Sequence, residues 1–391
     1  MSAPLIPPRR RGTGAIALVS LFGLLLPTGA CAGPDEPRAG ACLSGTLTYD
    51  YRDAEAGREK PLVTAPARNA DWELWGRTSA KASARRLASG ITDGGDGTFT
   101  ACYKAAGTLP EVHMRFRSSS TDLWRVVRDR TSQREYSFDS ASRFDVSAGR
   151  SLGTVKVPAK IQNAWHVVDT LNLLYGKRGN PASDCWTGHQ ETGRCDRLTF
   201  VWEPVENPDS GYWDHQEPQD NPEGTNAVIL SGAMTDSKHL ILHEAGHWWQ
   251  WQLHHRRFPV VTDCSPHFVD QHSSATCAWT EGFADAVAAY VLDDYRYVDE
   301  NGGETGFVND AATPGWDSGD TVQGRVGSSL LDLWAEDGPD GGTWDRTIGL
   351  MTREKSDDFR EFFMEDRPEA TPPLDTTGAA RDIINRHTID Y

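Results

Sequence analysis

The stretch that decides the fold is His243-Glu244-Ala245-Gly246-His247, which lies within residues 240–254. Residues four positions apart share one face of an α-helix, so the two histidines can present ring nitrogens to a single metal ion. Glu244 can then reach a water molecule on that ion. The H-E-x-x-H spacing therefore predicts a helix with two zinc ligands, His243 and His247, and a general base, Glu244.

The flanking residues fit this helix. Asp236 or Ser237 is expected to cap its N-terminus. Gly246 lowers the helix propensity by about 1 kcal/mol, and a closely packed neighbour would explain its presence. The alternative is that both histidines are ordinary core residues, although a purely structural helix gains nothing from two bare imidazoles on one face.

A catalytic zinc site needs a third protein ligand and one open position. Glu281, in the stretch Trp279-Thr280-Glu281-Gly282-Phe283-Ala284-Asp285, is the expected third ligand. H-E-x-x-H followed by E-G-x-A-D resembles the gluzincins, the zinc peptidases that include thermolysin. The resemblance implies that Asp285 orients a zinc-binding histidine. His247 and Glu281 are separated by 33 residues, more than is usual in that group. The alternative for Glu281 is an exposed acid near a helix N-terminus.

Peptide hydrolysis at such a site also needs a donor for the developing oxyanion. Arg325, just before an expected helix at residues 326–334, is a candidate because a fixed guanidinium suits that charge. Tyr290, Tyr295 and His272 are further candidates. Each of them has the alternative of ordinary packing or a solvated surface position.

The N-terminus predicts export. Three arginines at residues 9–11 precede an apolar run at residues 14–26, which is too short to cross a bilayer and ends in small residues, so residues 1–30 read as a signal peptide. Thr28-Gly29-Ala30-Cys31 resembles a bacterial lipobox, which implies lipidation of Cys31 and a tether at residues 31–41. The alternative is cleavage at Ala30-Cys31-Ala32, which would remove Cys31 and release a freely secreted protein.

Cysteine usage agrees with an oxidising compartment, because six cysteines remain once Cys31 is set aside. Neighbour spacing favours three disulfides, although six cysteines allow 15 connectivities. Free buried thiols or a cysteine zinc site are the alternative, but there is no C-x-x-C pair. The favoured pairs are Cys42 with Cys102, Cys185 with Cys195, and Cys264 with Cys277.

Charge divides the chain near Pro158. Residues 41–157 contain 18 Lys and Arg against 14 Asp and Glu, whereas residues 158–391 contain 17 against 40. The front part, residues 42–157, has short β-branched and aromatic runs with Gly, Asp and Pro between them, which predicts a β-sandwich. Its expected strands are residues 43–51, 70–75, 84–91, 98–103, 112–116 and 123–127. Gly45-Thr46-Leu47-Thr48-Tyr49, Trp72-Glu73-Leu74-Trp75 and the turn at residues 92–99 resemble transthyretin-like domains of secreted peptidases.

The back part, residues 158–391, reads as mainly helical with a small sheet that includes strands at residues 198–202 and 227–230, so the fold class is α+β. We expect an exported zinc metallopeptidase, lipid-anchored to the outer face of a bacterial membrane, that acts on peptides or proteins.

The acidic charge of the back part argues against nucleic-acid binding. Ca²⁺ at residues 299–304 lacks EF-hand spacing and is unsupported. The leading alternative is a cell-surface binding or adhesion module with a degenerate or structural zinc site; hydrolysis of a non-peptide amide or ester is a third reading. The oligomeric state stays open.

Overall fold

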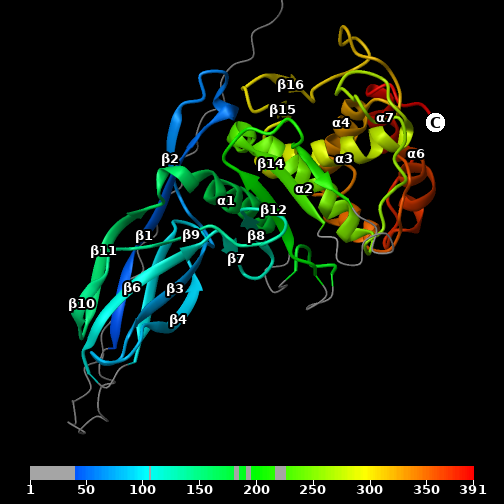
Figure 1. Ribbon diagram of the computed structural model, residues 1–391. Helices are drawn as coiled ribbons and strands as arrows, with labels where there is room; N and C mark the ends of the chain where they lie inside the picture. Colours follow the sequence, from blue (N-terminus) through cyan, green and yellow to red (C-terminus); the bar gives the residue numbers. More distant parts are fainter. Residues whose placement is uncertain (1–39, 105–106, 180–184, 191–194, 216–225) are drawn as a thin grey trace, which may run out of the picture. The chain divides into compact units, whose positions relative to one another are not determined.

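The structure is a computed structural model that describes residues 40–104, 107–179, 185–190, 195–215 and 226–391 (Figure 1). The expected signal peptide, Cys31 and nearly all of the tether lie outside these residues. Contacts between α-carbons group residues 39–391 into one compact unit. The division of this unit at Pro158 stays a prediction. Among the described helices, none is long and apolar enough to cross a membrane.

The front of the chain folds into two packed sheets. The first contains β11 (Gly149–Lys156), β1 (Ala41–Arg52), β2 (Leu62–Pro66) and β5 (Thr98–Tyr103). The second contains β10 (Arg143–Val146), β6 (Leu109–Arg117), β3 (Asp71–Arg77), β4 (Arg85–Ile91) and β9 (Ser137–Asp139). Alternate residues of β1 and β6 are buried, as expected for strands with one face on a core. The predicted sandwich is therefore present.

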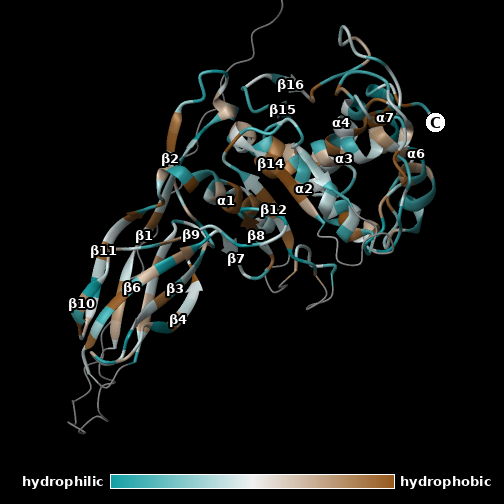
Figure 2. Cartoon of the chain, in the orientation of Figure 1, coloured by the Kyte–Doolittle hydropathy of each residue, from teal (hydrophilic) through white to brown (hydrophobic). Residues whose placement is uncertain are grey.

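The strand expected in the sandwich at residues 123–127 belongs to a different sheet. β8 (Trp124–Val127) does not join the sandwich but pairs in parallel with β12 (Leu198–Glu203). Its sheet has the order β13-β14-β12-β8-β7, with β13 (Tyr212–Asp214), β14 (Ala227–Ser231) and β7 (Ser119–Ser120). β8, β12 and β14 are parallel to one another. Almost every residue in them is buried, which is typical of parallel strands covered on both faces. The apolar residues of β14 appear in brown in Figure 2.

Helices pack around this third sheet. α1 (Gln162–Gly176) lies against β8 and β1, and α2 (Lys238–Leu253) lies between α1 and α3 (Ala275–Leu292). α4 (Gln323–Trp334) packs on the other side of α3. The remaining elements are the hairpin of β15 (Arg296–Val298) and β16 (Glu304–Gly306), and the helices α5 (Asp345–Met351), α6 (Phe359–Glu361) and α7 (Ala379–Arg386). Short 3-10 and π turns occupy Ala54–Ala56, Ala159–Ile161, Gly232–Asp236, Phe362–Asp366 and Arg367–Glu369. The fold class is α+β, as predicted.

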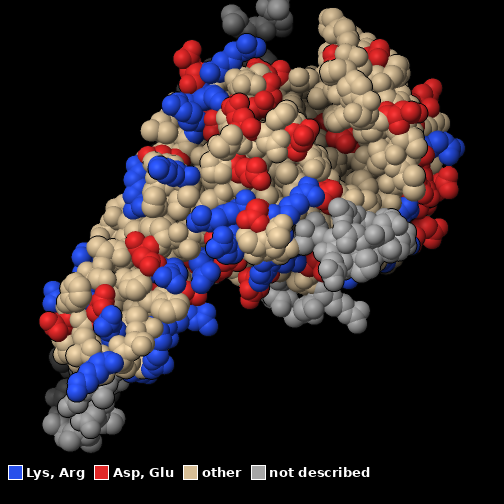
Figure 3. All heavy atoms as spheres, viewed as in Figure 1, with Lys and Arg blue, Asp and Glu red and all other residues tan. Residues whose placement is uncertain are grey.

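The structure contains the three disulfides in the favoured pairing: Cys42–Cys102, Cys185–Cys195 and Cys264–Cys277. Cys42 and Cys102 face each other across β1 and β5, so they join two neighbouring strands of one sheet. On the face drawn in Figure 3, basic side chains gather over the front strands and acidic side chains line the C-terminal side, in agreement with the division of charge in the sequence.

Two buried histidines make the stability of this fold depend on pH. Burial, the largest effect, lowers the pKa of His166 to about 3 and that of His254 to about 3, and nearby cationic side chains add to the shift. Both rings are at most 1% exposed. A histidine that is neutral in the folded state must be charged in the unfolded state below its usual pKa of about 6.5.

The stabilising contribution of each histidine is therefore complete above pH 6.5 and is lost as the pH falls from about 6.5 toward 3. We expect the free energy of unfolding to drop by about 1.4 kcal/mol per pH unit for each histidine in this window. Urea denaturation of the full chain at pH 7, 5.5 and 4.5 measures this slope. His254→Leu should flatten it, and an unchanged slope in that variant would contradict the assignment.

Candidate metal centre

α2 carries the two histidines of the H-E-x-x-H motif. Ser237 caps the helix, with its hydroxyl accepting a hydrogen bond from the backbone N–H of Leu240 at 2.9 Å. Four residues apart on one face, His243 and His247 bring their Nε2 atoms to 3.2 Å from each other. Both side chains are buried, and they open onto one cleft.

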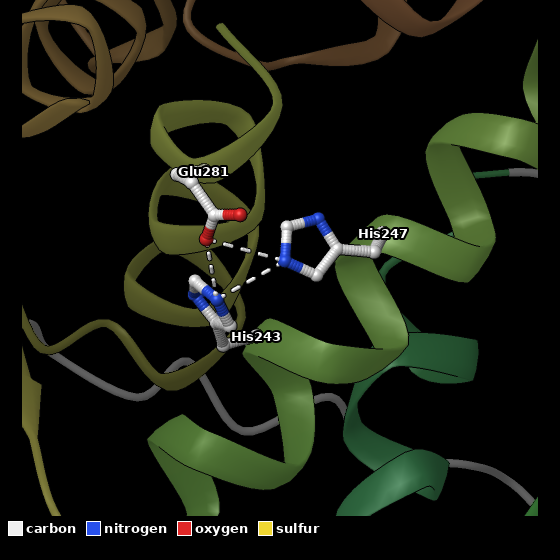
Figure 4. A group of neighbouring side chains, drawn as sticks. All are labelled: His243, His247 and Glu281. Atoms are coloured by element: carbon white, nitrogen blue, oxygen red, sulfur yellow. Dashed lines mark hydrogen bonds and ion pairs between the residues drawn. The ribbon is translucent and has the colours of Figure 1, made fainter. Parts of the chain in front are cut away.

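α3 supplies the third group. Its N-cap is Ser274, so the helix begins before Trp279 and Glu281 lies in its second turn. Glu281 Oε2 lies 3.1 Å from His243 Nε2 and 3.3 Å from His247 Nε2 (Figure 4). The side chain of Glu281 is buried rather than exposed at a helix end. The structure thus brings together the three residues that the sequence picked as ligands.

The two helices can approach closely because Gly246 has no side chain. A Cβ at position 246 would lie 2.9 Å from the Cα of Ala284 on α3. The expected close neighbour of this glycine is therefore the helix that carries Glu281. The long segment before α3 is closed by the Cys264–Cys277 disulfide, and Cys264 Sγ lies 3.7 Å from Glu281 Oε1.

The spacing of the three ligand atoms suits zinc. Ligand atoms about 2.0–2.2 Å from a tetrahedral zinc ion lie about 3.4 Å from one another. The separations of 3.1, 3.2 and 3.3 Å are close to this value. Two imidazoles and one carboxylate beside an open cleft are a donor set that is typical of catalytic rather than structural zinc sites. Among the described residues, this is the group of three that could hold a metal ion.

Asp285 lies one helical turn after Glu281, where it supports His243. Its Oδ1 is 2.8 Å from His243 Nδ1, and its Oδ2 accepts a hydrogen bond from Gln323 Nε2 at 3.0 Å. A proton on Nδ1 leaves the lone pair of Nε2 free for a metal. The arrangement agrees with the role that the gluzincin resemblance implied for Asp285, which stays a prediction.

Glu244 lines the cleft next to the histidines, and this cleft has a volume of about 320 Å³. Burial, the largest effect, raises the pKa of the Glu244 carboxyl, although the neighbouring His243 and His247 oppose the shift. A buried carboxyl with a raised pKa can both accept and return a proton. The geometry therefore permits the general-base role assigned to Glu244.

Arg325 does not line the cleft beside His243, His247 and Glu281, which together are called the metal group below. The prediction that Arg325 donates to the oxyanion is therefore wrong. Arg325 lies inside the first turn of α4, where Nε donates to the Asp317 carbonyl and Nη1 donates to Asn309 Oδ1 and to the Asp310 carbonyl. The guanidinium is 1% exposed and packs over the Trp316 ring. It holds surrounding loops together and cannot face a substrate in the cleft.

The other sequence-based donors also lie elsewhere. Tyr290 stacks on Trp344, Tyr295 lines a different cavity, and His272 bonds to Thr321. Tyr297 and His267, which were not among the residues predicted from the sequence, are among the residues that line the cleft. His267 belongs to the loop closed by Cys264 and Cys277. The expected disulfide, which brings this loop back to the helix of Glu281, was the feature of the sequence that could have indicated His267. Tyr297 precedes the glycine-rich turn of the β15–β16 hairpin, and this turn indicated the position of Tyr297 only weakly.

In the acidic stretch at residues 299–304, Asp299 and Glu304 have protein partners. Asp299 Oδ1 accepts the backbone N–H groups of Asn301 and Gly303, and Glu304 pairs with Arg296. The four tryptophans within or beside the two motifs are core residues rather than lining residues of the cleft, with at most 4% exposure: Trp248, Trp249, Trp251 and Trp279.

Comparison with known proteins gives two family matches. Residues 42–164 match the mycolysin middle domain, and residues 179–388 match the mycolysin C-terminal domain. No curated protein matches the chain. A solved structure, a 9R-lipoxygenase from Cyanothece, is 14% identical over 39% of this chain and 25% of the lipoxygenase chain, with a TM-score of 0.20. That similarity is too small to support an argument. The transthyretin-like resemblance of the front part stays a prediction.

Substitution of Gly246 tests whether the approach of α2 and α3 builds the centre. In Gly246→Ala, the added methyl group meets Ala284, so α3 must shift and carry Glu281 away from the histidines. We expect a loss of stability of about 1–3 kcal/mol from overpacking and weaker zinc binding. Chelator competition measures the zinc affinity, and urea denaturation measures the stability.

The matched control is Gly176→Ala at the end of α1, where an added Cβ meets nothing within 4 Å. This control should be neutral or stabilising by about 0.4–1 kcal/mol, because alanine restricts the unfolded chain. Equal zinc affinity in Gly246→Ala and the control would mean that the helix contact does not set the ligand geometry.

Proposed function

Because the chain belongs to the mycolysin family, with matches to both its middle and its C-terminal domain, we propose that it is an exported zinc metallopeptidase that hydrolyses peptide bonds. The observation that carries the proposal is the buried group of His243, His247 and Glu281, with ligand atoms within 3.1–3.3 Å of one another beside an open cleft. The family supports a secreted peptidase, and the donor set supports zinc rather than a harder cation. The gluzincin relationship is part of this proposal.

His243, His247 and Glu281 would hold the zinc ion, which would supply Lewis acidity to polarise a scissile carbonyl and to lower the pKa of a bound water to about 7. Glu244 takes the proton of the attacking water and returns it to the leaving amine. Its burial and its raised pKa suit both halves of this transfer. Asp285 keeps the His243 ring oriented through the contact at Nδ1.

Tyr297 is the proposed donor to the oxyanion, in place of Arg325. It lines the cleft with Glu244, and its ring centroid is 6.0 Å from that of His243. Burial raises the pKa of the Tyr297 phenol well above its usual range, and the carboxylates of Asp285 and Glu244 add to the shift. The phenol therefore stays protonated at neutral pH and can donate a hydrogen bond to developing negative charge.

The substrate is an extended peptide or a protein segment. β13 is the outer neighbour of β14 in the described sheet. β13 also lines the cleft through Tyr212 and Trp213, together with Phe258. Main-chain pairing with β13 would direct a substrate toward the metal group, and these aromatic side chains favour an apolar residue beside the scissile bond.

Export is part of the proposal. Three disulfides among the described residues suit an oxidising compartment outside the cytoplasm. Cys31 remains the proposed site of lipidation, with a freely secreted form as the alternative.

Glu244→Gln tests the peptidase function. The amide cannot take a proton from water, so we expect turnover of casein or of a peptide library to fall at least about 1,000-fold, within the range of lost general-base catalysis. Metal analysis should still find one zinc ion, because Glu244 is not among the three ligands. Zinc binding without peptide cleavage in the wild type would favour the binding module or the hydrolysis of a non-peptide ester or amide.

Tyr297→Phe tests the oxyanion donor. The substitution removes one hydroxyl from the cleft, and we expect kcat to fall about 100-fold with a smaller change in KM, because the bond forms only in the transition state. Tyr295→Phe is the matched control, since Tyr295 lines another cavity. If the two variants have equal kcat values, Tyr297 is not the donor.

A further inference from the structure

The loop between β1 and β2, residues 53–61, reaches from the sandwich to the first turn of α2. Figure 1 shows this turn, in blue, beside the start of α2 and the β15–β16 hairpin. Glu55 Oε1 accepts the backbone N–H of Lys238 at 2.6 Å and that of His239 at 3.1 Å. These two groups have no carbonyl partner within the helix. Residues about 180 positions apart in the chain thus complete one helix terminus.

The carboxylate of Glu55 is well held at this terminus. Its side chain is 12% exposed, Oε2 lies 3.1 Å from Lys238 Nζ, and Oε1 lies 3.4 Å from His239 Nδ1. Burial alone would raise the pKa of Glu55, but the hydrogen bond from His239 and the charge of Lys238 outweigh burial and lower the pKa. His239 is fully buried and also meets the Asp294 carbonyl, so it is neither solvent-facing nor in contact with the metal group.

The same loop also holds the hairpin that carries Tyr297. Arg296 Nη2 donates to the Glu55 carbonyl at 3.2 Å. Lys60 Nζ donates to the Glu300 carbonyl at 2.8 Å and to Asp236 Oδ2 at 2.9 Å. Gly302 packs so closely on the loop that a Cβ there would lie 2.5 Å from the carbonyl carbon of Gly57.

We propose that the β1–β2 loop sets the position of α2 relative to the β15–β16 hairpin, and thus of Glu244 relative to Tyr297, with Glu55 as the positioning residue. The sandwich is then a structural part of the catalytic centre and not only a spacer. The inference rests on the proposed peptidase function, because the readout that it predicts is a rate. Glu55 does not touch the metal group and acts only through the elements that it holds.

The test compares Glu55→Ala, Glu55→Gln and a control in the full chain. Asp50→Ala is the control, because Asp50 pairs with Lys156 and Thr64 inside the sandwich and has the same charge. In Glu55→Ala we expect kcat on a fluorogenic peptide to fall about 10- to 100-fold while KM stays similar, as for misplaced catalytic groups. Zinc content should remain at one ion. Glu55→Gln keeps an oxygen that can accept both N–H groups and should recover part of the rate.

A kcat for Glu55→Ala equal to that of Asp50→Ala overturns the inference. If Glu55→Ala does not fold, Lys60→Met carries the test, since it frees the loop from Asp236 and the hairpin and should lower kcat about 10-fold. An unchanged kcat in Lys60→Met would also contradict the proposed role of the β1–β2 loop.

Amide hydrogen exchange keeps the two proposals apart. In Glu55→Ala, but not in Asp50→Ala, residues 238–241 and 296–298 should exchange faster, whether or not the chain is active. A wild-type chain that neither binds zinc nor cleaves peptides contradicts the proposed function. In that case faster exchange in both segments still supports the loop as the holder of α2 and the hairpin, and unchanged exchange overturns it.

Discussion

The contact between α2 and α3 at Gly246 and Ala284 is the constraint on which the candidate site depends. Two histidines on one helix give only part of a coordination sphere, and the third donor must come from a second helix at a fixed depth. The absence of a side chain at Gly246 allows the backbones to approach until Glu281 Oε2 lies 3.1 Å and 3.3 Å from the Nε2 atoms of the two histidines. The same approach places Asp285 against the far nitrogen of His243.

Other elements stabilise this contact from outside. α4 packs on α3 through Gly282, where a Cβ would lie 2.9 Å from Val326 Cβ, and Gln323 on α4 donates to Asp285. The disulfide of Cys264 and Cys277 closes the segment before α3 and keeps His267 at the cleft. The metal group is therefore held by packing on both sides, which limits the rearrangement needed when an ion binds.

The local part of the site could be predicted from the sequence, and the distant part could not. His243, Glu244 and His247 follow from helical spacing, and Glu281 follows from a second motif with its own pattern. Arg325 was chosen because it precedes a helix and carries the right charge, but its partners, Asn309 and Asp310, are set by tertiary contacts. Tyr297 reaches the cleft only because a hairpin folds back on α2.

The fold divides in the same way. The strands of the sandwich alternate in burial, so their existence was predictable, whereas the sheet that β8 joins is decided by a strand more than 70 residues later. Glu55 could not be predicted as a positioning residue from the sequence, because its partners lie far away in the chain. The first turn of α2 is completed by a carboxylate that lies 183 residues earlier in the chain, so this turn reaches its final form only when the β1–β2 loop is in place. Synthesis from the N-terminus makes the β1–β2 loop before α2, and a circularly permuted chain would reverse that order.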